Sequence, residues 1–87
     1  MFIQTEPTPN PATLKFLPGR LVAGSRLTEY RSASEAQASP LAAALFSVQG
    51  VSQVFFGGDF VSVTKSDGDW AHLKPSILGV IMEHFVS

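Results

Sequence analysis

The chain has 87 residues, of which 45% are hydrophobic and 15% charged, with six basic against seven acidic side chains. This length and hydrophobicity suit one small folded domain over residues 1–87 and exclude a disordered segment. The net charge of -1 provides no basic field for nucleic acid, and the absence of cysteine excludes disulfides, thiolate nucleophiles and thiolate metal ligands.

We expect no targeting segment at the amino end and no membrane-spanning helix near the carboxyl end. The amino end has neither a secretory signal nor an Arg/Ser-rich leader, and the longest apolar stretch, 77–85, is far short of the ~20 residues that cross a bilayer. We therefore expect no membrane partner and a location in the bacterial cytoplasm, with the mitochondrial matrix as the alternative if a transit peptide has been removed.

The first half of the chain predicts short strands. Residues 2–5 form the first, and the prolines in 7–11 then exclude a helix and leave an extended connector. Residues 13–17 alternate apolar and polar side chains, which predicts a second strand ending at a turn. A loop over 19–24 and a weakly patterned strand over 27–32 follow.

A helix is predicted where Ser39 can cap the first free N–H groups and Pro40 occupies the first helical position, with Gly50 ending the segment. The Ser/Ala-rich residues 32–39 before it are expected to be a connector.

A hairpin and a second helix complete the predicted elements. Residues 51–56 and 60–65 are rich in Val and Phe, and the short link between them favours an antiparallel hairpin. From Trp70 to Phe85 apolar residues recur at helical spacing, with Pro75 in or just after a loose first turn.

These elements predict an α+β fold, because strands with one apolar face and two amphipathic helices bury their apolar sides best in two layers. We expect a two-layer sandwich, with a mostly antiparallel sheet and both helices packed on one face. The expected members of the shared core are Leu45, Phe55, Val63, Ile77 and Ile81.

Motifs for catalysis are missing: no nucleotide-binding glycine loop, paired-histidine motif or nucleophile elbow occurs. We therefore expect no enzymatic activity. The segment 67–72 contains three candidate ligands for iron or another metal, Asp67, Asp69 and His72. They could converge on one ion if the last three residues of this segment make a helical turn. In the alternative reading, Asp67 makes a turn, Asp69 caps a helix and His72 is solvated.

Several short motifs, in this order and spacing, cover nearly the whole chain. They are Thr8-Pro9-Asn10-Pro11, Leu14-Lys15-Phe16, Ser39-Pro40-Leu41-Ala42, Leu45-Phe46, Gly50-Val51, Phe55-Phe56, Asp59-Phe60-Val61-Ser62-Val63, Lys65 and Trp70. Together they resemble the N-terminal domain of Nfu-type (NifU-like) iron–sulfur cluster scaffold proteins.

The resemblance implies a role in iron–sulfur cluster assembly and transfer to recipient proteins. Family members join this domain to a C-terminal domain whose Cys-x-x-C motif holds the cluster, so no cofactor is expected on this chain, which looks like an excised domain continuing near Val86-Ser87. The implied partners are cluster donor and recipient proteins and that second domain, and the isolated domain is expected to be a monomer. No catalytic residue carries over.

Protein recognition is the mechanism we expect for such a domain, and loops placed on a rigid sheet are where recognition usually occurs. The candidate contacts are Asn10 in the proline-rich connector and Gly57, Gly58 and Asp59 in the hairpin loop. The alternative is that these residues only build turns.

Overall fold

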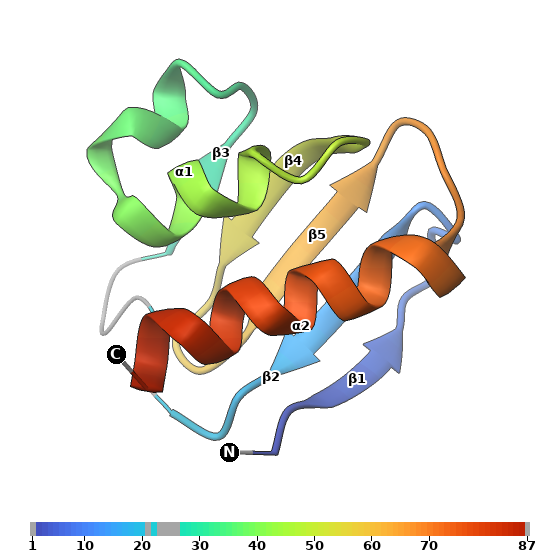
Figure 1. Ribbon diagram of the computed structural model, residues 1–87, viewed down its shortest axis with the longest axis horizontal. Helices are drawn as coiled ribbons and strands as arrows, with labels where there is room; N and C mark the ends of the chain where they lie inside the picture. The colour runs from blue at the N-terminus through green and yellow to red at the C-terminus, as the bar shows by residue number, and fades with distance from the viewer. Residues whose placement is uncertain (1, 21, 23–26, 87) are drawn as a thin grey trace.

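The computed structural model describes residues 2–20, 22 and 27–86, in which two α-helices cover one face of a five-stranded sheet (Figure 1). The strand order is β1-β2-β5-β4-β3 and every neighbouring pair is antiparallel. This confirms the predicted α+β sandwich. The predicted loop at 19–24 lies partly outside the described residues. The elements are β1 (Gln4–Pro7), β2 (Thr13–Leu17), β3 (Thr28–Tyr30), the 3-10 helix η1 (Glu35–Ala38), α1 (Pro40–Phe46), β4 (Val51–Phe56), β5 (Val61–Lys65) and α2 (Trp70–Val86).

The two outer strands differ from their predicted bounds. β1 runs on to Pro7, because it is an edge strand and a proline at such an edge is tolerated. β3 stops at Tyr30 instead of continuing to 32, because the backbone N–H of Arg31 donates to a carboxylate oxygen of Glu35 at 2.8 Å. The Glu35 side chain therefore takes the backbone N–H of Arg31 that a neighbouring strand would otherwise have bound.

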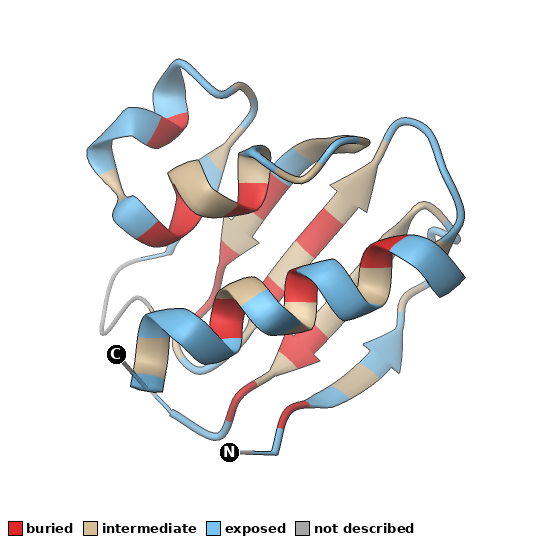
Figure 2. Cartoon of the chain, in the orientation of Figure 1, coloured by how far each residue is buried: buried red, intermediate tan, exposed pale blue. Residues whose placement is uncertain are grey.

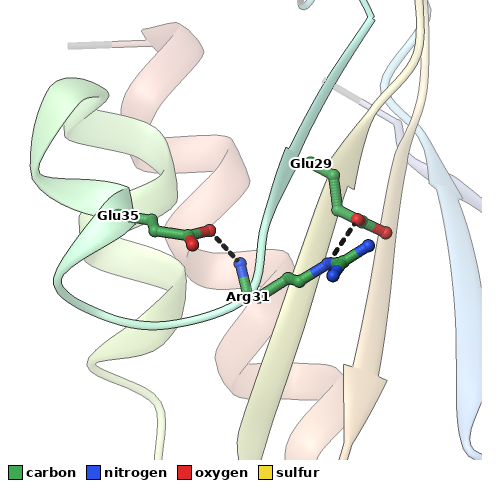
Figure 3. A network of polar contacts seen from close by, with 3 residues as sticks. All are labelled: Glu29, Arg31 and Glu35. Carbon is green, nitrogen blue, oxygen red and sulfur yellow. Dashed lines mark hydrogen bonds and ion pairs between the residues drawn. The ribbon is translucent and has the colours of Figure 1, made fainter.

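A small polar network holds the segment after β3 (Figure 3). Besides the contact with Glu35, Arg31 donates from Nε to Glu29 at 2.7 Å, and this hydrogen bond raises the pKa of Arg31 above its ordinary value, with the charge of Glu29 acting in the same direction. Ser32 accepts from the backbone N–H of Glu35 at 3.2 Å, and Ala36 is fully buried. The connector predicted for 32–39 thus contains a 3-10 turn.

The core lies between the sheet and the helices, where Figure 2 shows the buried residues on facing surfaces. Of the predicted core residues, Leu45, Val63, Ile77 and Ile81 are fully buried, but Phe55 was wrongly assigned. Since alternate residues of a strand point to opposite faces and Val54 and Phe56 point inward, Phe55 lies on the open face of the sheet, half-buried. The buried core is Ile3, Phe16, Ala36, Leu41, Ala42, Leu45, Val54, Phe56, Val61, Val63, Leu73, Ile77 and Ile81.

Local signals set the starts of both α-helices. The Ser39 hydroxyl accepts from the N–H of Ala42 at 3.2 Å, as the predicted cap requires, and Pro40 follows at the first helical position. Asp69 caps α2 by accepting from Ala71 at 3.2 Å, and Pro75 lies inside that helix rather than ending it. In the described part of the chain, no helix is long and apolar enough to cross a membrane.

Long-range hydrogen bonds tie the connector after β1 to the end of β5 and to the start of α2. Trp70 donates from its indole nitrogen to the carbonyl of Pro11 at 3.0 Å, and Lys65 donates its backbone N–H to Ala12 at 2.8 Å. At the same end, Gly50 has φ +104°, and an added Cβ would lie 2.7 Å from the carbonyl oxygen of Asp67. These contacts fix one end of the sheet.

Candidate functional site

The turn between β4 and β5 carries three of the predicted contact residues, Gly57, Gly58 and Asp59. Gly57 donates its N–H to the carbonyl of Phe60 at 2.9 Å, which places Gly58 and Asp59 at the tip. A Cβ added at Gly57 would overlap the Phe60 ring. Gly57 is therefore buried beneath that ring and is a structural residue, whereas Asp59 is exposed.

A hollow of about 340 Å³ lies beside this turn, lined by Phe2, Gln4, Leu17, Gly19 and Asp59. Gln4 and Leu17 are register partners in β1 and β2, so the sheet supplies one wall. Among the described lining residues, Asp59 is the one with a charged side chain. Sequence reasoning named Asp59 but not the other lining residues, because they come from separate segments; only the outward direction of Leu17 follows from strand alternation.

The tip of the turn is anchored to the neighbouring loop. The carbonyl of Gly58 accepts from the backbone N–H of Val22 at 2.8 Å, and Val22 packs against the core. The predicted contact residue Gly58 thus has an intramolecular role, because it holds Val22 close to the turn.

The open face of the sheet carries an aromatic pair next to this hollow. The rings of Phe55 and Phe60 stack with centroids 6.0 Å apart, and Lys15 Nζ lies 4.3 Å from the Phe60 centroid. Lys15 also forms an ion pair with Glu6 at 3.9 Å. The face away from the helices therefore combines apolar rings with paired charges.

Asn10 lies at the opposite end of the sheet from the β4–β5 turn. The pairing of Thr13 with Thr64 and of Phe16 with Val61 puts the β1–β2 connector next to the end of β5, while the turn precedes its start. Asn10 accepts from the backbone N–H of Ala12 at 2.9 Å, which is a turn-building role. The structure does not bring the predicted contact positions into one patch.

Asp67, Asp69 and His72 line one hollow of about 300 Å³. The carboxylate of Asp67 accepts from its neighbour Gly68 at 2.8 Å, and that of Asp69 caps α2 as described above. Among the described residues, no group of three or more His, Cys, Asp or Glu side chains is arranged to hold a metal ion. Both aspartates make the local backbone contacts of the alternative reading.

Comparison with known proteins identifies a family. The sequence model of the family described as "Scaffold protein Nfu/NifU N terminal" matches residues 3–87. A curated protein of Drosophila virilis named "NFU1 iron-sulfur cluster scaffold homolog, mitochondrial" is 53% identical over 89 residues, covering 100% of this chain and 30% of its own length. The human protein of the same name is 49% identical and is covered over 35% of its length. The chain thus spans about a third of the length of these curated relatives.

Two solved structures share the fold. A NifU-like protein from Saccharomyces cerevisiae superposes with a TM-score of 0.84 at 28% identity, over 97% of this chain and 77% of that one. A Staphylococcus aureus protein gives 0.78 at 28% identity, over 93% of this chain and 99% of that one.

Proposed function

Since the chain belongs to the Nfu/NifU N-terminal family of scaffold proteins, we propose that it is an accessory and interaction domain in iron–sulfur cluster assembly and transfer. The observation that carries the proposal is the family match over residues 3–87, together with relatives named as iron–sulfur cluster scaffolds. The domain positions other proteins and performs no chemistry on a substrate.

The cluster is cargo that this chain does not hold. Iron–sulfur clusters are bound chiefly by cysteine thiolates, and the sequence contains no cysteine. The cluster belongs to a separate Cys-x-x-C domain of the complete protein, and the greater length of the curated relatives supports such a domain. Reconstitution of the isolated chain with iron and sulfide is expected to leave no charge-transfer absorption after desalting.

The contact surface we propose includes the β4–β5 turn, whose exposed member is Asp59. Gly57 and Gly58 support it by shaping the turn, and Asn10 belongs to a separate loop at the other end of the sheet. The partners are cluster donors, cluster recipients and the cluster-holding domain. The isolated domain is a monomer, and the mitochondrial label of the relatives favours the matrix as its compartment.

A transfer assay with the full-length, cluster-loaded protein and an apo-recipient tests this function. Deleting the domain should slow cluster transfer, and charge reversal at Asp59 (Asp59→Lys) should weaken recipient binding. Unchanged transfer rates after the deletion would contradict an accessory role.

Metal carriage is the second candidate, favoured by the shared hollow of Asp67, Asp69 and His72. Under the preferred function, replacing Asp67 and His72 together by Ala leaves cluster transfer nearly unchanged; Asp69 stays intact so that the helix cap is kept. Titration of ferrous iron by calorimetry decides between the two functions. Micromolar binding that is lost in the double variant would make metal carriage the leading function.

A further inference from the structure

Asp59 differs from every other acidic side chain in the described part of the chain. The others contact a cation or a backbone N–H or have another partner, whereas the carboxylate of Asp59 has neither a hydrogen bond nor an ion pair. Arg20 is exposed and follows Gly19, which lines the same hollow, but it does not pair with Asp59. The hollow therefore presents one negative charge that the chain itself leaves unpaired.

The hollow is held in shape by hydrogen bonds. The pairing of β1 with β2 fixes the wall that contains Gln4 and Leu17. The bond from Val22 to Gly58 holds Val22 against the turn that carries Asp59. The backbone of the β1–β2 wall and of the turn is therefore positioned before a ligand binds, which lowers the entropy cost of binding.

Phe2 adds an aromatic surface to the hollow. It is 79% exposed, the highest value among the large hydrophobic side chains that the structure describes as exposed, and it lines the hollow together with Leu17. An apolar wall, an aromatic ring and a carboxylate in one hollow complement a planar cation carried on an apolar stem. Arginine has this chemistry: its guanidinium stacks on aromatic rings and binds carboxylates through two parallel hydrogen bonds.

We propose that this hollow binds an arginine side chain of a partner protein, with the stem against Leu17 and the guanidinium between Phe2 and Asp59. The proposal rests on the proposed interaction function and names the chemistry that the domain recognises in its partner.

The test uses the 87-residue chain and three acetylated, amidated peptides, Gly-Leu-X-Leu-Gly, in which X is arginine, lysine or citrulline. Binding is followed by backbone amide shifts in two-dimensional NMR. The arginine peptide should give saturable shifts centred on Gln4, Leu17, Gly19 and Asp59. Citrulline, which is nearly isosteric but uncharged, should bind about tenfold more weakly, the scale expected for loss of a charge-assisted hydrogen bond. The lysine peptide should fall between them.

Two variants and one control connect the binding to these residues. Asp59→Asn should weaken the arginine peptide about tenfold, and Phe2→Ala should weaken it while reducing the preference for arginine over lysine. Asp67→Asn removes the same charge at the other end of the sheet, so it should leave the affinity unchanged. All three positions are exposed, and the NMR spectra verify that each variant stays folded.

Several results would overturn the arginine site: no saturable shift with the arginine peptide, equal affinity for arginine and citrulline or for arginine and lysine, or an equal effect of Asp59→Asn and Asp67→Asn. Such a result leaves the proposed function standing if deletion of the domain still slows cluster transfer. Conversely, arginine binding without any effect of the deletion would preserve the site and contradict the function.

Discussion

Gly57 and Gly79 show how differently two glycines act in this chain. Gly57 lies beneath the Phe60 ring, so its missing side chain is required by a close approach. Gly79 lies on the exposed side of α2, and an added Cβ there would meet no atom within 4 Å. Gly79 therefore lowers the stability of the helix without improving its packing.

Alanine at these two positions is expected to change stability in opposite directions. Gly57→Ala should lower the free energy of unfolding by about 1–3 kcal/mol, because the Phe60 ring must move away. Gly79→Ala should raise it by about 0.5–1 kcal/mol, because alanine costs less backbone entropy in a helix. Urea unfolding of both variants measures the changes. A rise in both would refute the packing described for the turn, and a fall in both would refute the open surroundings described for Gly79.

At the scale of single elements, Ser39 and Ser34 offer a matched pair of helix caps. The Ser39 hydroxyl accepts a hydrogen bond at the start of α1, whereas Ser34, before η1, makes no side-chain cap contact. Ser39→Ala should therefore cost about 1 kcal/mol of unfolding free energy, and Ser34→Ala should stay within about 0.5 kcal/mol of the parent. Thermal unfolding measures both variants, and equal losses of stability in Ser39→Ala and Ser34→Ala would contradict the difference described between the two caps.

Elements with local signals were the ones that the sequence predicted best. The start of α1 depends on Ser39 and Pro40, which are adjacent, and the β4–β5 hairpin depends on one short turn. η1 was missed because its polar contacts join Arg31 and Ser32 to Glu35 without any hydrophobic period. Phe55 was misassigned because β4 contains two adjacent phenylalanines, Phe55 and Phe56. The sequence does not show which of the two points toward the helices until the strand register is known.

The candidate site was predictable only at its tip. Asp59 follows two glycines between strands, which marks a turn, but the hollow also needs residues from β1, from β2 and from the loop after it. No periodicity in the sequence relates these segments, because their proximity is set by strand order. The separation of Asn10 from the turn has the same origin.

For the whole molecule, stability depends on the shared core of sheet and helices. Leu45 of α1 and Ile81 of α2 are both fully buried in it. Truncating either to Ala should cost about 2–5 kcal/mol through lost burial and the cavity left behind. Phe55→Ala should cost less than either, because its ring is only half-buried on the open face. Near-neutral changes at both core positions in chemical denaturation would contradict the helix-on-sheet packing.

The central place of β5 has a consequence for the order in which the chain folds. Its pairing with β4 closes a short loop, whereas its pairing with β2 joins residues 51 positions apart, as in the contact between Thr13 and Thr64. Closing the longer loop costs more chain entropy, so the β1–β2 hairpin should join the sheet after the folding transition state. In stopped-flow fluorescence of Trp70, Val54→Ala should slow folding, whereas Leu14→Ala should mainly speed unfolding. If Leu14→Ala slowed folding and Val54→Ala mainly sped unfolding, the amino-terminal hairpin would nucleate the fold. With the expected result, the walls of the hollow around Asp59 are completed last.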